Sequence, residues 1–120
     1  MEYKIINSEY LDSVSGGDPL IIKDLVDIFR DQVAETIETM RDLNNKGDFP
    51  QLALLAHKIK SSVSIMGMND LAIMLKTFEL KARESEDPGS YNSYIQRLES
   101  DCASAIIELD NLIANRLKQP

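Results

Sequence analysis

The sequence predicts an all-α protein, an antiparallel up-down-up-down four-helix bundle preceded by a short N-terminal helix. Three observations predict it: glycine and proline cluster at a few places, the segments between them repeat apolar residues with a helical period, and no segment alternates apolar and polar residues as a strand does. Short connections between long helices favour antiparallel neighbours. With 120 residues, of which 43% are hydrophobic, the chain can build one core, so residues 1–120 are expected to form a single domain.

Two helices are expected in the N-terminal part of the chain. A short one at about residues 8–14 has Ser8 as its expected N-cap, and it depends on tertiary contacts because so short a helix is unstable alone. A long helix starts after Asp18, a capping residue, with Pro19 in its first turn. Its buried face is expected to consist of Ile22, Val26, Phe29, Val33, Ile37 and Met40.

Three further helices follow. One is capped by Asp48 and ends at Gly67, the next begins near Asn69 or Asp70, and the last is capped near Ser90. Their expected core residues are Leu52, Leu55, Ala56, Ile59, Val63 and Met66; then Leu71, Leu75, Phe78 and Ala82; then Tyr91, Ile95, Leu98, Cys102, Ala105, Leu109 and Leu112.

The composition excludes several classes of function. The formal net charge of −7, from 20 acidic and 13 basic residues, disfavours binding to nucleic acid or to an anionic membrane surface. With one histidine and one cysteine, the chain cannot assemble a zinc site or a disulfide framework from several such residues, and we expect no metal or cofactor. Cys102 falls on the apolar stripe of the last helix, which favours a core position over a reactive thiol.

The hydropathy of the chain predicts a cytoplasmic protein. Residues 1–7 lack the long apolar segment of a signal peptide. No stretch approaches the roughly 20 apolar residues that cross a bilayer. We therefore expect neither secretion nor a membrane-bound form.

The single histidine, His57, is expected on the solvent face of its helix. At about 100° per residue it projects roughly 140° away from the core stripe. Its neighbours on that face are small or basic: Ala53, Lys60 and Ser61 lie one turn away, and Ser64 lies one turn further. A lysine beside an uncrowded imidazole favours an anion such as a phosphoryl group, with a merely solvated surface histidine as the alternative.

Three charged residues share one flank of the following helix. Lys76, Glu79 and Arg83 are spaced by three and four residues, beside the core stripe. They form either a solvated salt-bridged stripe or part of a site. In a site, Glu79 would accept a hydrogen bond from one nitrogen of His57 and turn the other outward as a nucleophile, while Arg83 would steer a partner or a phosphate. The sequence leaves these two interpretations equal.

The stretch from Leu52 to Leu71, LALLAHKIKSSVSIMGMNDL, resembles histidine-containing phosphotransfer (Hpt) domains. The family pattern is Ala-His-x-x-Lys-Gly-Ser/Ala, followed by a glycine and a Leu-rich helix. Here the motif is followed by a helix break at Gly67 and by a segment that continues the family pattern to Arg83. A looser similarity, which includes the glycine pair near Gly16, extends over most of the chain.

The resemblance implies a role for each motif residue. His57 would accept the phosphoryl group through Nε2, and Lys60 would stabilise that group. Glu79 occupies the position from which family members, with Gln or Glu, hydrogen-bond the histidine. Ser61 stands where the family usually has glycine. We interpret it as a tolerated variant that crowds a docking partner and slows transfer.

The resemblance also implies the reaction and the partners. Such a domain relays a phosphoryl group between aspartates of response-regulator receiver domains, starting from a histidine kinase, including a hybrid one. The receiver would supply Mg²⁺ and the acidic pocket, and protonation of the imidazole at low pH would slow acceptance. The alternative is a non-catalytic helical module that binds a receiver or kinase and inhibits signalling. An enzyme with His57 and Glu79 as an acid–base pair is disfavoured, because no second nucleophile or metal set accompanies them.

A second apolar line on the first long helix is the expected docking surface. Ile21, Leu25 and Ile28 lie beside the core stripe, which does not require them. We call these three residues the shoulder and predict that a receiver binds there, with a wider core as the equal alternative. Leu54 is a further apolar residue expected on the surface.

Overall fold

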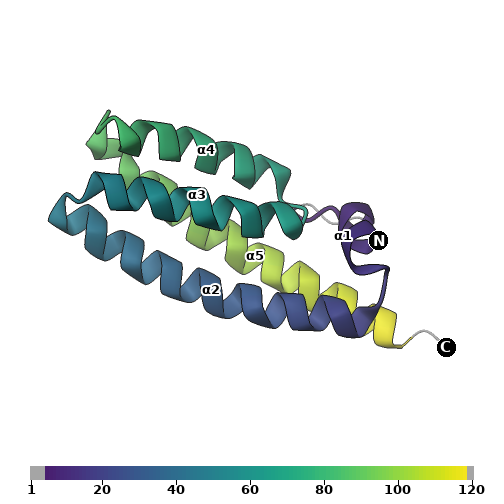
Figure 1. Cartoon of the computed structure of the whole chain (residues 1–120). Helices are drawn as coiled ribbons and strands as arrows, with labels where there is room; N and C mark the ends of the chain where they lie inside the picture. The colour runs from purple at the N-terminus through teal and green to yellow at the C-terminus, as the bar shows by residue number, and fades with distance from the viewer. Residues whose placement is uncertain (1–4, 119–120) are drawn as a thin grey trace.

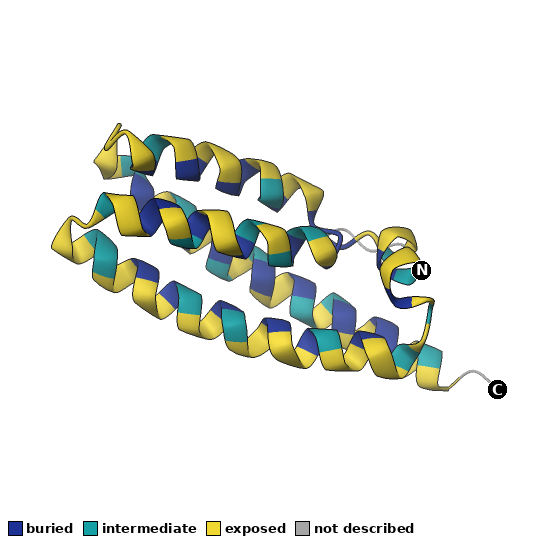
Figure 2. Cartoon of the chain, viewed as in Figure 1, coloured by how far each residue is buried: buried dark blue, intermediate teal, exposed yellow. Residues whose placement is uncertain are grey.

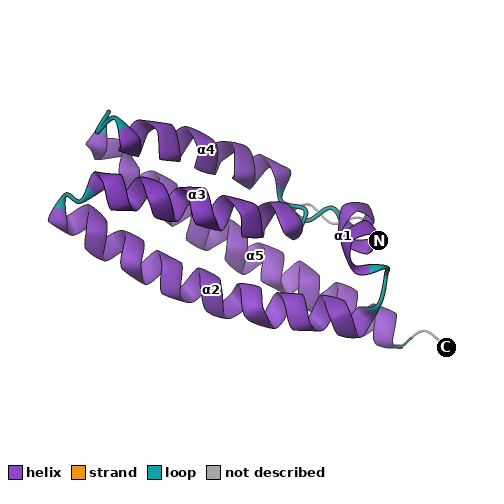
Figure 3. Ribbon diagram, in the orientation of Figure 1, coloured by secondary structure: helices purple, strands orange, loops and turns teal. Residues whose placement is uncertain are grey.

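The computed structural model describes residues 5–118. Over this range every regular element is a helix and none is a strand, so the prediction of an all-helical fold is confirmed (Figure 3). The elements are α1 (Ser8–Ser15), α2 (Pro19–Lys46), α3 (Phe49–Ile65), α4 (Asn69–Arg83), the 3₁₀ turn η1 (Pro88–Ser90) and α5 (Tyr91–Leu117).

The long helices lie side by side in an elongated bundle of 52 × 21 × 19 Å (Figure 1). The turn from α2 to α3 and the turn from α4 to α5 lie at one end of the bundle, and the turn from α3 to α4 lies at the other. Helix α1 sits at that second end, near the α3–α4 turn. Helices α3 and α4 therefore run alongside one another from a shared turn.

Aspartate caps begin two of the long helices, as predicted. Asp18 accepts a hydrogen bond from the backbone N–H of Leu20, and Asp48 accepts one from that of Gln51. In each case a proline occupies the first turn, where its missing N–H costs nothing. Local sequence signals therefore decide where α2 and α3 start.

The predicted cap of α1 was wrong by one residue. Asn7, not Ser8, is the N-cap: its backbone is extended (φ −105°, ψ 101°) and its Oδ1 accepts from Tyr10 N at 3.1 Å. Ser8 is already helical. Both residue types are good caps, so the choice between them depends on where the preceding chain is held.

The other two helices begin without a side-chain cap. Helix α4 starts at Asn69, within the predicted limits, after Met68. Ser90 precedes α5 as expected, but its hydroxyl donates to the carbonyl of Asp87 and does not cap the helix. The turn before α5 is thus closed by a local hydrogen bond.

The predicted core stripes lie inside the bundle (Figure 2). All six predicted core residues of α2 are buried, as are the predicted ones of α4 and α5. In α3, Leu55 is only half-buried, although it packs against the core. Buried residues beyond the predicted stripes include Met68, Met74 and Ile113. The helical period is therefore enough to find the centre of each buried face.

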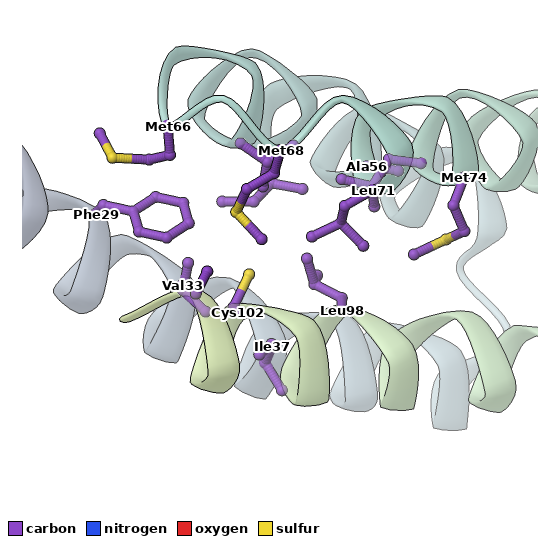
Figure 4. Packing of buried hydrophobic residues seen from close by; sticks show 14 of the residues in the cluster. Phe29, Val33, Ile37, Ala56, Met66, Met68, Leu71, Met74, Leu98 and Cys102 are labelled. Atoms are coloured by element: carbon purple, nitrogen blue, oxygen red, sulfur yellow. The ribbon is translucent and has the colours of Figure 1, made fainter. Parts of the chain in front are cut away.

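Cys102 is a core residue, as expected. It is 1% exposed and points into the same interior as Phe29 and Met68 (Figure 4). Burial away from water disfavours the thiolate and raises the pKa of Cys102 to about 12. A thiol with so high a pKa is neutral at physiological pH and is a weak nucleophile.

The N-terminal segment is pinned to the end of the bundle at Gly67. The backbone N–H of Asn7 donates to the carbonyl of Gly67 at 3.1 Å, and the N–H groups of Ile5 and Ile6 donate to the carboxylate of Glu108. Gly67 has a φ of +77°, and a Cβ there would lie 2.7 Å from Asn7 N and 2.8 Å from Asn7 O. Glycine is thus required for both the turn and the close approach.

Candidate functional site

His57 lies on the outer surface of α3, as predicted. Its side chain is 59% exposed. It borders an open hollow of about 410 Å³, together with Pro50, Ala53 and Leu54 of α3 and Arg83 of α4. None of residues 5–118 therefore blocks access to the imidazole from this side.

Glu79 holds the inner side of the imidazole ring. The Nδ1 atom of His57 lies 3.1 Å from Oε1 of Glu79, which comes from the neighbouring helix α4. Because an ionised carboxylate can only accept a hydrogen bond, Nδ1 carries the proton in this contact. In the neutral ring, the lone pair is then on Nε2, at the opposite side of the imidazole.

Two cationic side chains share the same carboxylate. Lys60 Nζ lies 3.4 Å from Oε1 of Glu79, and the guanidinium of Arg83 donates to Oε2. Glu79 is 5% exposed, whereas the side chains of Lys60 and Arg83 are 24% and 57% exposed. The site is thus one buried carboxylate surrounded by an imidazole and two cations.

These contacts keep Glu79 ionised. Burial by itself raises the pKa of Glu79, but the hydrogen bond from His57 and the charge and hydrogen bond of Lys60 outweigh it, so the pKa is lowered overall. The carboxylate is therefore an anion at neutral pH and can orient the imidazole.

The charged flank of α4 is not the solvated stripe that was one of two interpretations. Lys76 is exposed, but the carboxylate of Glu79 is buried between the helices. The interpretation in which Glu79 accepts a bond from His57 is the one that the geometry matches. The expected role of Arg83 in steering a partner or a phosphate stays a prediction, and its guanidinium also binds Glu79.

The small residues around His57 differ in their accessibility. Ser61 is exposed, while Ser64 is half-buried and its hydroxyl donates to the carbonyl of Lys60 at 2.9 Å. Ala53 was expected on the partner-binding face, but it is only 4% exposed, because α3 turns this position toward its neighbours. The contribution of Ala53 is its small size, which leaves the hollow beside His57 open.

A comparison with protein families agrees with this arrangement. The family model that matches is the Hpt domain, over residues 24–115. The chain belongs to the Hpt domain family. No curated protein and no solved structure matches it. Hpt domains are phosphocarriers in two-component phosphorelays and interact with receiver domains and histidine kinases, so this chain takes part in histidine phosphotransfer.

An apolar groove runs along this Hpt domain between α3 and α4. It has a volume of about 650 Å³ and extends from Lys60 and Lys76 to the apolar side chains of Ile65, Ile73 and Leu80. These three apolar residues are 42%, 67% and 47% exposed. We did not predict these three residues from the sequence, although a signal was available: each is an apolar residue away from the core stripe of its helix.

The shoulder of the Hpt domain is only partly a surface. Ile21 and Ile28 are 46% and 66% exposed, but Leu25 is half-buried and packs against the core. Leu25 also lines a small cavity of about 90 Å³ with Ile28 of α2 and Ile65 of α3. The wider-core alternative is therefore correct for Leu25, and the exposed positions are Ile21 and Ile28. Leu54 is 52% exposed, as expected.

Within residues 5–118, no group of three or more His, Cys, Asp or Glu side chains is placed to hold a metal ion. None of the helices there is both long and apolar enough to cross a membrane.

Proposed function

We propose that this Hpt domain relays a phosphoryl group between the aspartates of receiver domains through a phosphohistidine at Nε2 of His57. The observation that carries the proposal is the 3.1 Å contact between Nδ1 and the buried carboxylate of Glu79. It assigns the proton to Nδ1, so the lone pair of Nε2 is available on the exposed side of the ring.

The transfer needs one nucleophile from this chain. The lone pair of Nε2 forms a bond to phosphorus while the bond from phosphorus to the aspartate oxygen of the receiver breaks, and the aspartate leaves as a carboxylate. The imidazole gains positive charge as this happens, and the anionic Glu79 stabilises that charge through the Nδ1 proton. In the onward step the same charged ring is the leaving group.

Lys60 and Ser61 complete the acceptor side. Lys60 is half-buried and 3.4 Å from Glu79, one turn after His57, so its ammonium can also bind an oxygen of a phosphoryl group held on Nε2. Ser61 is exposed one turn from His57, where its hydroxyl borders the same region and its bulk limits how closely a receiver approaches. We expect this serine to slow transfer relative to glycine.

The divalent cation belongs to the receiver in this proposal. The two cations that bind Glu79 beside His57, Lys60 and Arg83, repel Mg²⁺. A receiver would bring Mg²⁺ with its own acidic pocket. Catalysis would then depend mainly on placing Nε2, the phosphorus and the leaving oxygen in line. The only cofactor-like group in the reaction would thus come with the partner.

Docking would use the apolar surface on both sides of α3. The exposed shoulder residues Ile21 and Ile28 lie toward α2, and the groove bordered by Lys76 lies toward α4. An antiparallel up-down-up-down bundle, supported by turns at alternating ends (Figure 1), would make these surfaces one continuous face. We propose that residues 1–120 act as one cytoplasmic domain between a histidine kinase, including a hybrid one, and its receivers.

Transfer of label from a phosphorylated receiver tests the proposal. The chain is incubated with each phosphorylated receiver of its organism, and acid-labile, base-stable label on it is measured. We expect label on the wild-type chain and none on His57→Gln, since His57 is its only histidine. No label on the wild-type chain from any receiver would overturn the relay, and receiver binding without transfer would favour an inhibitory module.

A further inference from the structure

Arg83 is not needed to neutralise the charge of Glu79, because Lys60 already does so. Arg83 lies one helical turn after Glu79 on α4, and its side chain is 57% exposed. An exposed arginine on a helix can be fully solvated. Here it donates instead to Oε2, the oxygen that His57 and Lys60 do not use.

The two carboxylate oxygens of Glu79 thus bind different partners. Oε1 receives His57 Nδ1 and Lys60 Nζ, both from α3, and Oε2 receives Arg83 from α4. The last torsion of a glutamate side chain is broad, so the carboxylate does not hold its own orientation. A donor on Oε2 restricts that rotation and keeps Oε1 directed toward the imidazole.

We propose that Arg83 is a positioning residue: by holding Oε2 of Glu79 it keeps Oε1 on Nδ1 of His57, and so keeps the nucleophilic lone pair on Nε2. This inference rests on the function proposed above and adds to it a residue that does not touch the phosphoryl group. The guanidinium suits the role because its planar donors match a carboxylate and it stays charged at every physiological pH.

Nitrogen NMR of the imidazole tests the proposal without any partner protein. We compare the ratio of the Nδ1–H to the Nε2–H tautomer in wild type, Arg83→Gln and Arg83→Lys. The ratio is expected to fall about threefold in Arg83→Gln, the size of effect that a half-exposed ion pair supports, and to recover in part in Arg83→Lys.

Arg97→Gln is the matched control. Arg97 also pairs with a carboxylate four residues away on its own helix, Asp101, and its side chain is 50% exposed. Arg97 belongs to α5 and lies beside Asp70 and Leu71, at the start of α4. Arg83 is the last residue of α4, at the opposite end of that helix. This variant should leave the tautomer ratio unchanged.

A chemical phosphoryl donor connects the tautomer to reactivity. Nε2 attacks the phosphorus of phosphoramidate, the phosphorus–nitrogen bond breaks and ammonia leaves, while the Nδ1 proton stays in its hydrogen bond to Glu79. The rate of phosphohistidine formation should fall in Arg83→Gln in proportion to the fraction of the Nδ1–H tautomer, which the measured ratio gives. It should be unchanged in Arg97→Gln.

The rival role for Arg83 is a docking charge, because it borders the same hollow as His57. If Arg83→Gln slows transfer only from a receiver, while the tautomer ratio and the phosphoramidate rate stay at the wild-type values, the positioning role is wrong. A wild-type chain that accepts nothing from any receiver would overturn the relay, but the tautomer ratio would still decide the role of Arg83.

Discussion

Glu99 and Glu79 are two of the carboxylates in this bundle that bind arginine, and their surroundings differ. Glu99 of α5 binds Arg41 of α2 through both oxygens, at 3.1 and 3.0 Å, and its side chain is 44% exposed. Glu79 of α4 is 5% exposed and divides its oxygens between Arg83, Lys60 and His57. The pairing on the α2–α5 face has the more regular geometry, yet only the α3–α4 pairing has an exposed imidazole in its network.

The difference shows that burial decides how strongly a carboxylate depends on its protein partners. The pKa of Glu99 is lowered, chiefly by the hydrogen bond from Arg41, but water surrounds the pair and screens it. Water reaches Glu79 poorly, so its bonds depend on its protein partners and respond to their loss. We therefore expect the α3–α4 face to carry the proposed chemistry and the α2–α5 face to tolerate change.

The largest difference is expected between the variants that remove each carboxylate, Glu79→Ala and Glu99→Ala. In Glu79→Ala the imidazole loses its Nδ1 acceptor, and orienting partners of an imidazole are worth roughly 10–100-fold where they have been removed from metal sites. We expect a loss of this size in the rate of phosphohistidine formation, and none in Glu99→Ala. Equal rates in the two variants, with unchanged circular dichroism, would remove the distinction between the faces.

A second comparison uses apolar side chains on the two faces. Ile28 of α2 is 66% exposed beside α3, and Ile107 of α5 is 71% exposed. We expect Ile28→Asp to weaken receiver binding about tenfold, as for an apolar contact near the centre of an interface, and Ile107→Asp to have no effect. Titration calorimetry measures both, and the opposite ranking would place docking on the α2–α5 face.

The pH dependence of the free energy of unfolding is a further, smaller difference that we expect between Glu79 and Glu99. The pKa of Glu79 in the folded chain lies below its ordinary value of 4.5, so the ionised group stabilises the fold above that pH. This contribution is lost as the pH falls through the lowered pKa. We expect Glu79→Gln to lower the free energy of unfolding by about 1 kcal/mol at neutral pH.

Urea unfolding measures this difference at neutral pH and again below the lowered pKa. The destabilisation by Glu79→Gln should shrink at the acidic pH, because the wild-type carboxyl is then protonated as well. Glu99→Gln provides the matched exposed position and should give the smaller change at either pH. A loss in Glu79→Gln that stays constant with pH would mean that packing, not ionisation, is responsible.

The smallest effect is expected from the exposed arginine itself. Arg41→Gln removes the guanidinium from Glu99 on the α2–α5 face, where both partners are largely hydrated. We expect no measurable shift in Tm and no change in the rate of phosphohistidine formation. A clear drop in Tm would show that this pair contributes more than its exposure suggests.

The local features of the helices were predictable because they depend on neighbours in sequence. The caps at Asp18 and Asp48 and the six-residue stripe of α2 all follow from the backbone of one helix and its 3.6-residue period. The same period placed His57 on the surface. Each of these features needs no information from another helix.

The misassigned residues depend on contacts between elements. Leu25 is half-buried because α2 packs closely enough to widen the core, and Ala53 is buried although its helix angle placed it beside His57. The choice of Asn7 over Ser8 as a cap goes with the bond from Asn7 to Gly67 in a distant turn. A helical wheel describes one helix and contains no information on these contacts between elements.

The sequence by itself determined an all-helical chain, an exposed histidine with a lysine one turn away, and a resemblance to Hpt domains. Only the tertiary structure decided that Glu79 is buried, and that its oxygens divide between α3 on one side and Arg83 on the other. The reason is physical: the environment of a carboxylate depends on the register between two packed helices, and that register is set by contacts far apart in the chain.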